Sequence, residues 1–308
     1  MTQSAPGRRM KLGLIPSIDE GDFNGQTARF SEIRDTAVAA EQAGFDSLWL
    51  ADHLIFRFPN RDEQGCWELF TFLSALAAVT SRVQLGPLVA CTAFRNPALI
   101  AKMADSIDEI SNGRFILGLG AGWHEPEYRA FGYPFDHLAS RFEEALQIIL
   151  PLLRGDHVDF EGKYYQARDA VLRPRGPSKA GPPIMIGSGR PRMLELTARY
   201  ADMWNTTGWN QGVDHIASKY PTLQEACQKV GRDPATIEFT AAVGVKLLAP
   251  GESRPEKAPE LTGTPEEVAA MLRGFVDIGL QHLIVALAPD GVAGVERFAR
   301  VIALLDQG

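Results

Sequence analysis

The sequence predicts an α/β fold: a (β/α)8 barrel of the TIM type that takes up the whole 308-residue chain as one domain, with an insertion after the fourth helix. Short apolar runs alternate with amphipathic helical runs, as in βα units that build a parallel sheet. Eight such pairs can be counted along the chain, and no internal sequence repeat accompanies them. A doubly wound open sheet is the alternative arrangement of the same units.

The first four pairs occupy the N-terminal half of the chain. Gly44 follows one helix as a C-terminal cap, and Asn96-Pro97 supplies the N-cap and first residue of another. The expected strands cover residues 12–16, 46–50, 83–91 and 114–119, and the expected helices cover 27–43, 69–80, a stretch from 97 onward, and 138–153.

Residues 154–183 interrupt this alternation and form the predicted insertion, whose segment FEGKYYQARDAVLRP is typical of a hairpin. The alternation then resumes, and Thr264, Pro265 and Glu267 form the capping-box pattern of the seventh helix. The remaining expected strands cover residues 184–186, 203–206, 237–247 and 282–286, and the remaining helices cover 192–200, 213–230, a stretch from 265 onward, and 292–305.

The composition is that of a globular protein and argues against several function classes. A net charge of −7 with no run of basic residues argues against a nucleic-acid surface. Three widely spaced cysteines suggest neither a disulfide framework nor a metal site. Residues 1–10 are expected to be a disordered tail, because no apolar stretch long enough for a signal peptide or a membrane span follows them. These features favour a cytoplasmic protein.

The stretch GRFILGLGAGWHEPEYRAFG, residues 113–132, contains the clearest site signal. A buried strand leads into three alternating glycines, which let the backbone turn sharply or approach a flat ligand. Trp123, His124, Glu125 and Glu127 follow at once. A dinucleotide fingerprint is excluded, because it needs glycine where Trp123 stands and because Pro126 interrupts the expected helix. The structural alternative is a glycine-rich bend with a solvated acidic loop.

Other polar residues follow neighbouring strands, whose carboxyl ends meet at one mouth of a barrel. Asp52-His53 follows the second strand, and an imidazole beside a carboxylate is suited to acid-base chemistry, although a structural histidine is the alternative. We expect the Asp52 carboxylate to orient His53. Cys91 is expected to be a wall residue, and Arg95 either binds an anion or caps a helix.

The segment Gly187-Ser188-Gly189-Arg190 ends the fifth strand just before a helix. Glycines, a hydroxyl and a helix N-terminus with unpaired N–H groups predict a phosphate cradle, with an ordinary turn as the alternative. Trp204 and Asn205, near the end of the sixth strand, are expected to add an aromatic group and hydrogen-bonding groups. Motifs of hydrolytic and zinc enzymes are absent from the sequence, so a pocket for a flat cofactor and hydride chemistry fits best.

Over nearly its whole length the chain resembles the luciferase-like monooxygenase superfamily of flavin- and deazaflavin-dependent oxidoreductases. The stretches that carry the resemblance are EQAGFDSLWLADH, LSALAAVTSRVQLGPLV, FRNPALIAKMADSIDEISNGRFILGLGAGWHEPEYRAFG, FEGKYYQ, PPIMIGSG with ARYADMWN, and LTGTPEEVA. The resemblance implies a (β/α)8 barrel, commonly a homodimer, that binds FMN or the 8-hydroxy-5-deazaflavin coenzyme F420 at the strand C-termini. It further implies a small-molecule substrate.

The resemblance also implies roles for individual residues. Asp52 and His53 match a pair beside the cofactor ring, and Leu88-Val89 matches a strand bulge that holds a cis peptide in many deazaflavin-binding members. The expected catalytic residues are His53, Asp52 and Trp123. The expected cofactor contacts are Asp52, Leu88, Val89, Ala90, Cys91, Ala121, Gly122, Gly187, Ser188, Gly189 and Arg190.

One departure limits what the resemblance implies about the substrate. Deazaflavin sugar-phosphate dehydrogenases of this superfamily carry glutamate where this chain has Trp123, and tryptophan where it has Arg57. The leading expectation is therefore hydride transfer between coenzyme F420 and a small organic substrate, without dioxygen. An FMN-dependent monooxygenase is the alternative, and a barrel that binds the cofactor without catalysis is a third hypothesis.

Overall fold

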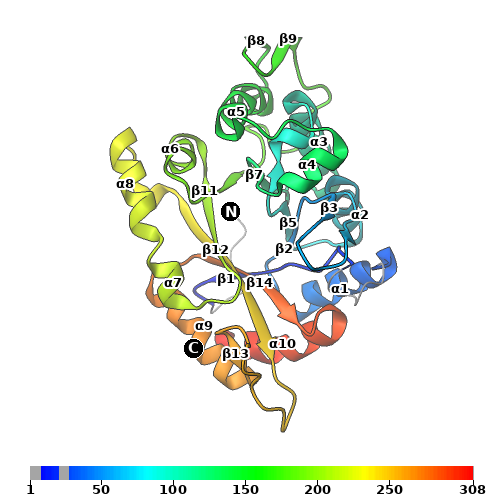
Figure 1. Cartoon of the computed structure of the whole chain (residues 1–308), viewed down its shortest axis with the longest axis vertical. Helices are drawn as coiled ribbons and strands as arrows, with labels where there is room; N and C mark the ends of the chain where they lie inside the picture. The colour runs from blue at the N-terminus through cyan, green and yellow to red at the C-terminus, as the bar shows by residue number, and fades with distance from the viewer. Residues whose placement is uncertain (1–7, 21–27, 308) are drawn as a thin grey trace.

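The structure is a computed structural model, and it describes residues 8–20 and 28–307. One parallel sheet curves into a barrel (Figure 1). Hydrogen bonds between Leu85 and the segment before β7 close it, at the Leu85–Phe115 bridge. The barrel strands are β1 (Lys11–Leu14), β2 (Ser47–Leu50), β5 (Gln84–Pro87) with β6 (Ala90–Cys91), β7 (Leu117–Gly120), β10 (Ile184–Gly187), β11 (Met203–Gly208), β12 (Glu238–Leu247) and β14 (His282–Ala288).

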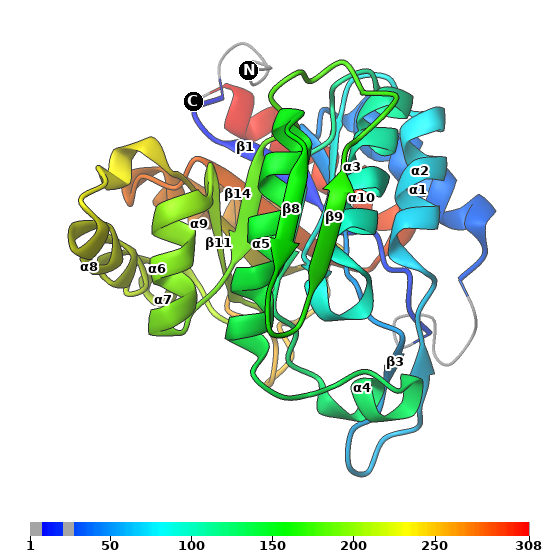
Figure 2. The same ribbon diagram turned by 90° about the horizontal axis from the view of Figure 1, so that it is seen from above.

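Because β5 and β6 share one position, the barrel has the eight strand positions that the sequence predicts, and the predicted barrel is confirmed. Helices surround the strands (Figures 1 and 2). The ring helices are α1 (Phe30–Ala43), α2 (Leu69–Val79), α3 (Pro97–Ser111), α5 (Leu138–Arg154), α6 (Pro191–Tyr200), α8 (Tyr220–Val230), α9 (Pro265–Asp277) and α10 (Gly291–Asp306). Short helices and strands in the connections are α4 (Glu125–Phe131), α7 (Val213–Ala217), η1 (Thr92–Phe94), η2 (Pro234–Thr236), β3 (Ile55–Phe56), β4 (Gln64–Gly65) and β13 (Thr262–Gly263).

Local sequence signals set the ends of several helices. The Asn96 side chain accepts a hydrogen bond from the N–H of Ala98, with Pro97 as the first helical residue, and Thr264 and Glu267 form the predicted capping box. Gly44 ends α1 in the left-handed region, with φ of 97°, where a residue with a Cβ is strained. These predictions are confirmed.

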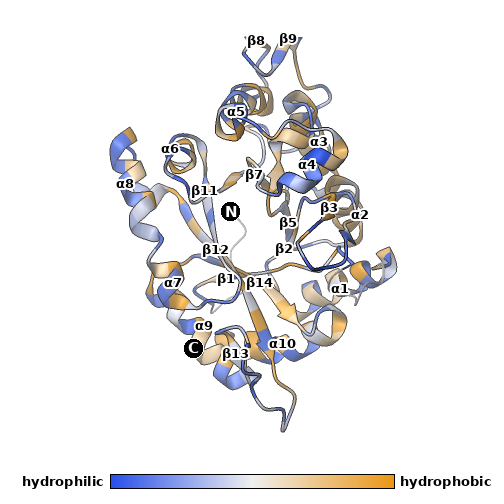
Figure 3. Cartoon of the chain, viewed as in Figure 1, coloured by the Kyte–Doolittle hydropathy of each residue, from blue (hydrophilic) through white to orange (hydrophobic). Residues whose placement is uncertain are grey.

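The hydrophobic core has two layers. A small inner layer fills the barrel between its walls and consists of Trp49, Ile116, Met185, Met203, Ala242 and Ile284. A larger layer lies between the strands and the ring helices. Figure 3 shows that the ring helices carry both hydrophobic and hydrophilic residues, as expected for helices with one face on the barrel. The Trp49 indole lies so close to Gly13 and Gly86 that a Cβ at either position would meet it at 2.7 or 2.6 Å.

The predicted insertion contains the expected hairpin, β8 (Val158–Glu161) paired with β9 (Gln166–Ala170). β8 packs against α5, the helix that precedes it in the chain. The carboxylate of Glu144 on α5 accepts hydrogen bonds from the N–H groups of Lys163, Tyr164 and Tyr165 in the hairpin turn. These bonds fix the hairpin to the barrel.

Three predictions about element limits are wrong. The strand expected at 83–91 is split between β5 and β6, because a bulge at Leu88-Val89 turns the backbone, and its peptide is cis. The helix expected at 213–230 is split into α7 and α8, with Pro221 in the first turn of α8. Pro126 does not prevent a helix, because it occupies the first turn of α4, where no N–H partner is needed.

The expected tail at residues 1–10 is wrong in its last part. Arg8 and Met10 are buried, and Arg8 forms an ion pair of 2.6 Å with Asp46. Residues 1–7 lie outside the described residues, as does the expected helix start at residue 27. No helix in the described ranges, 8–20 and 28–307, is long and apolar enough to cross a membrane.

Candidate active site

The predicted site residues lie in β6 and at or just after the ends of β2, β5, β7 and β10, and the parallel register of these strands places their carboxyl ends at one mouth of the barrel. The connection from β2 to α2 carries the short hairpin β3–β4, and the connection from β7 to α5 carries α4. Figure 2 shows α4 beside β3, and the two elements are in contact. Residues far apart in the sequence therefore share one wall of this mouth.

His53 is paired with Glu127 and not with Asp52. The Nδ1 atom of His53 lies 2.9 Å from Oε1 of Glu127, and the N–H of Leu54 donates to Oε2 of the same carboxylate at 2.8 Å. Glu127 is 1% exposed, whereas the His53 side chain keeps 14% exposure. Since a carboxylate only accepts, Nδ1 carries the proton and Nε2 is left for a ligand. The prediction that Asp52 orients His53 is wrong.

Asp52 instead forms a buried ion pair with Arg95. The guanidinium donates to both carboxylate oxygens, at 2.7 and 3.0 Å, and the N–H of Cys91 donates to one of them. Burial raises the pKa of Asp52, but these donors favour its charged form. Asp52 and His53 therefore have different partners although they are adjacent in the sequence. Arg95 also contacts Glu68 at 2.6 Å, so it joins β2, β6 and α2.

Aromatic rings surround His53. Its ring centroid lies 4.3 Å from that of Phe56 and 5.6 Å from that of Trp123. Phe58 stacks on Phe56 at 5.8 Å and on Trp123 at 6.3 Å, and His124 contacts both Phe58 and Trp123 at 5.0 Å. The N–H of Arg57 donates to Nε2 of His124, whose pKa burial lowers, so His124 is a neutral acceptor.

Val89, an expected cofactor contact, lies between the ends of two strands. Its side chain is half-buried above the inner core layer, and it fills the space beside two glycines at strand ends. A Cβ at Gly120 would meet a Val89 methyl at 2.5 Å, and a Cβ at Gly187 would meet one at 3.1 Å. Glycine is therefore needed at both strand ends for Val89 to occupy the space between them.

The other expected cofactor contacts near β6 and β7 are more enclosed. Ala90 and Cys91 are buried, and Cys91 Sγ lies 2.9 Å from the Tyr128 hydroxyl, which donates to the carbonyl of Ala121. Burial raises the pKa of the Cys91 thiol to about 12, which disfavours the thiolate that a nucleophile needs. Gly122 has φ of 82°, and a Cβ there would collide with the Tyr128 hydroxyl.

The predicted phosphate loop presents two exposed residues. The N–H of Ser188 donates to the carbonyl of Asn205, and its hydroxyl bonds Thr197, so Ser188 is held within the barrel wall. Gly189 and Arg190 are exposed, Arg190 is the N-cap of α6, and a Cβ at Gly189 would meet no atom within 4 Å. The loop leaves open space at a helix N-terminus, which fits an anionic group.

Trp204 and Asn205 are both buried. Trp204 is 1% exposed and stacks on Phe239 in the outer core layer, and the Asn205 side chain donates to Thr240 inside the barrel. Both residues nevertheless support the predicted phosphate loop, because the Trp204 indole N–H donates to the carbonyl of Ser188 and the carbonyl of Asn205 accepts from the Ser188 N–H. Successive side chains of β11 point alternately to the ring helices and to the barrel interior. Both of these sides are buried.

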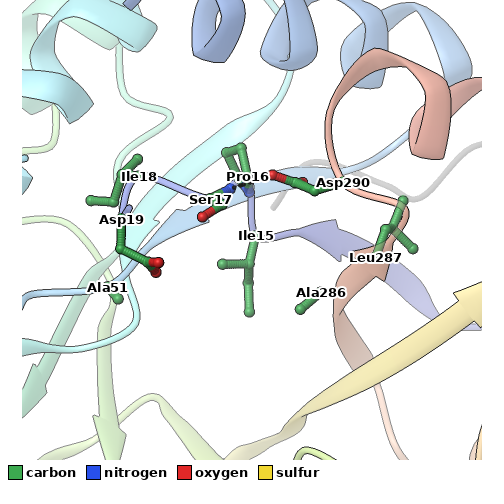
Figure 4. Close-up of a pocket in the computed structure, with 9 residues that line it drawn as sticks. All are labelled: Ile15, Pro16, Ser17, Ile18, Asp19, Ala51, Ala286, Leu287 and Asp290. Atoms are coloured by element: carbon green, nitrogen blue, oxygen red, sulfur yellow. Dashed lines mark hydrogen bonds between the residues drawn. The ribbon is translucent and has the colours of Figure 1, made fainter. Parts of the chain in front are cut away.

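A pocket at the ends of β1, β2 and β14 was not expected from the sequence. Figure 4 shows its lining side chains, which include Ser17, Asp19, Ala51 and Asp290. Ser17 Oγ is buried and has no hydrogen-bond partner among residues 8–20 and 28–307. The pocket adjoins the Asp52-His53 segment through Ala51. Asp19 and Ser17 follow β1, whose short run lacked the glycine and aromatic signals seen after β7.

The barrel carries a histidine-carboxylate pair, a strand bulge and an open helix N-terminus at its mouth. These features are those of barrel enzymes that bind a cofactor at the ends of their strands. Residues 10–258 match the family model of the luciferase-like monooxygenases. The chain belongs to the luciferase-like monooxygenase family, as its sequence motifs predicted.

Several relatives show where in the family the chain lies. It is 31% identical to an F420-dependent glucose-6-phosphate dehydrogenase of Kineococcus radiotolerans, over 90% of this chain and 91% of the relative. It is 39% identical to the pyrimidine monooxygenase RutA of Methylorubrum extorquens, over 73% of this chain and 64% of the relative. The solved F420-dependent secondary alcohol dehydrogenase, in complex with an F420-acetone adduct, is 20% identical with a TM-score of 0.79, over 96% of this chain and 99% of that one. That structural likeness confirms the fold.

Proposed function

We propose that this protein is an F420-dependent oxidoreductase that moves a hydride between the coenzyme and a small organic substrate. The observation that carries the proposal is His53, held through Nδ1 by the buried Glu127 carboxylate with Nε2 directed away from that bond. Relatives named as F420-dependent dehydrogenases, 31% and 30% identical to this chain, support the choice of coenzyme.

The residues at the mouth fit such a coenzyme. Val89 offers an apolar surface for one face of a flat ring, between Gly120 and Gly187. The open space at Gly189, with Arg190 and the N-terminus of α6 beside it, suits the coenzyme phosphate. Leu88, Ala121 and Gly122 lie at the ends of the neighbouring strands, where backbone atoms can contact the ring. When bound, the coenzyme supplies a ring carbon that accepts or donates a hydride.

The chain's own residues handle the proton. When an alcohol is oxidised, Nε2 of His53 accepts the hydroxyl proton, and Glu127 stabilises the imidazolium that forms. In the reverse direction the same imidazolium donates a proton to the carbonyl oxygen. Asp52, through Arg95 and the N–H of Cys91, holds the segment that carries His53, and Trp123 packs edge-on against the His53 ring. Asp52 is thus a positioning residue.

Coenzyme titration tests the proposal. The purified protein is titrated with F420 and with FMN, and the F420 reaction is then run with and without air. We expect F420 to bind and turnover to be independent of oxygen. Binding of FMN alone, or stoichiometric oxygen consumption, contradicts the proposal. Light scattering of the same sample tests the homodimer that the family resemblance implies.

An FMN-dependent monooxygenase is the second candidate. It is favoured by the similarity to the pyrimidine monooxygenase RutA, which at 39% exceeds the 31% identity to the Kineococcus dehydrogenase but covers less of both chains. The same Val89 surface and Gly189 loop would accept FMN, so the titration above decides between the two coenzymes.

A further inference from the structure

The aromatic wall, by which we mean Phe56, Phe58, Trp123 and His124, faces the candidate acid-base residue. Its rings come from two separate connections, the one after β2 and the one after β7, and they contact one another in a continuous chain that ends at His53. Trp123 is 59% exposed, the largest exposed fraction among the exposed large hydrophobic side chains described. A ligand that reached Nε2 of His53 along this wall would cover the indole.

The wall offers little to an anionic substrate. His124 is neutral, because burial lowers its pKa and its Nε2 accepts the Arg57 N–H. The Arg57 guanidinium is paired with Glu63 at 3.0 Å, and that of Arg61 lies over the Phe58 ring, 5.7 Å from its centroid. The charge beside His53 itself is the Glu127 carboxylate. A phosphate beside His53 would therefore lie close to the Glu127 carboxylate, which disfavours an anion there.

We propose that the substrate is a neutral alcohol or ketone that carries an aromatic ring next to the reacting carbon. The ring packs on Trp123 and Phe58, and the oxygen reaches Nε2 of His53. This inference rests on the proposed function, because it names the substrate class of the same site. Offset or edge-on contacts with exposed rings favour a planar apolar group, and the Glu127 carboxylate beside His53 disfavours an anionic one.

In the reaction, the C–H hydride of the aryl alcohol passes to the oxidised coenzyme as the O–H proton passes to His53, which leaves an aryl ketone and the reduced coenzyme. Two electrons leave the carbinol carbon and two enter the coenzyme. The relatives named as glucose-6-phosphate dehydrogenases would then differ from this chain in substrate class, although they share its fold.

Calorimetric titration of the F420-loaded protein with acetophenone, methyl cyclohexyl ketone and glucose 6-phosphate tests the inference. We expect acetophenone to bind most tightly. Trp123→Ala should weaken acetophenone binding about tenfold, which is the change in affinity expected when one well-oriented aromatic contact is lost. Trp123→Phe keeps an aromatic ring at this position and should restore most of the affinity. Phe131→Ala is the matched control, because Phe131 is 54% exposed on α4 and is not one of the rings that form the aromatic wall. It should leave binding unchanged.

The proposed substrate class is overturned if glucose 6-phosphate or methyl cyclohexyl ketone binds more tightly than acetophenone. It is also overturned if Trp123→Ala leaves the affinity for acetophenone unchanged. The coenzyme is measured separately. If F420 binds and another alcohol is oxidised while acetophenone shows no preference, this inference fails and the proposed function stands. If F420 does not bind, the proposed function fails first.

Discussion

Replacing Glu127 with glutamine should lower turnover far more than it lowers coenzyme affinity. The substitution keeps the size of the side chain but removes the charge that accepts from His53 Nδ1 at 2.9 Å and from the Leu54 N–H at 2.8 Å. A hydrogen bond to a charged group is worth about 1.5–3 kcal/mol, so the loss in kcat should be about tenfold to 150-fold. Either His53 Nδ1–H or the Leu54 N–H must then face the N–H₂ group of the glutamine and lose its acceptor. This loss lowers the free energy of unfolding by about 1–3 kcal/mol.

The assay is steady-state reduction of F420 under anaerobic conditions, together with a thermal melt and a coenzyme titration of each variant. Glu125→Gln is the matched control, because Glu125 lies on the same helix but pairs with the exposed Arg129 at the surface. It should retain kcat within about twofold, since exposed ion pairs contribute little. A folded Glu127→Gln variant with the kcat of the parent protein would refute the role of the histidine-carboxylate pair.

Three further predictions concern coenzyme binding and the stability of the fold. Gly189→Leu should weaken coenzyme binding at least tenfold and leave the melting temperature unchanged, because the leucine side chain would enter the space assigned to the phosphate. An unchanged coenzyme affinity would place the phosphate elsewhere. Arg95→Met should lower the free energy of unfolding by about 3–5 kcal/mol in denaturant titrations, because it leaves the Asp52 carboxylate buried without its partner, and a loss below about 1 kcal/mol would contradict this. Burial lowers the pKa of His282 below its ordinary value of 6.5, so its contribution to stability is present above that pH and is lost as pH falls below it. His282→Gln should flatten this acid dependence, and an unaltered profile would exclude His282 as its source.

The barrel was predictable because each βα unit carries its own local signals. Glycine at a helix end, as at Gly44, and an N-cap followed by proline, as at Asn96-Pro97, act within a few residues and need no tertiary information. The limits were missed where the backbone departs from regular structure. The break before Pro221 depends on how neighbouring helices pack. The cis peptide at Leu88-Val89 was expected from the family resemblance and is confirmed, but the apolar pattern of residues 83–91 alone did not show where the strand divides.

The site was only partly predictable, because sequence order shows which loops meet but not which side chains pair. Asp52 and His53 are adjacent in sequence, yet their partners, Arg95 and Glu127, lie 43 and 74 positions away. Glu127 stood in the stretch singled out after β7, but its role depends on α4, a helix that the sequence analysis did not include. The aromatic residues between β2 and α2 had no pattern of their own, since their contact with Trp123 is tertiary.

Transfer of isotope from substrate to coenzyme tests the central claim most directly. The protein is incubated without air with oxidised F420 and an aryl alcohol deuterated at the carbinol carbon, and the reduced coenzyme is examined by mass spectrometry and NMR. Our account predicts one deuterium at C5 of the reduced coenzyme and none from a parallel reaction of unlabelled alcohol in heavy water, because the hydride passes directly between the two bound molecules. Deuterium acquired at C5 from solvent, or alcohol oxidation that requires oxygen and FMN, would contradict it.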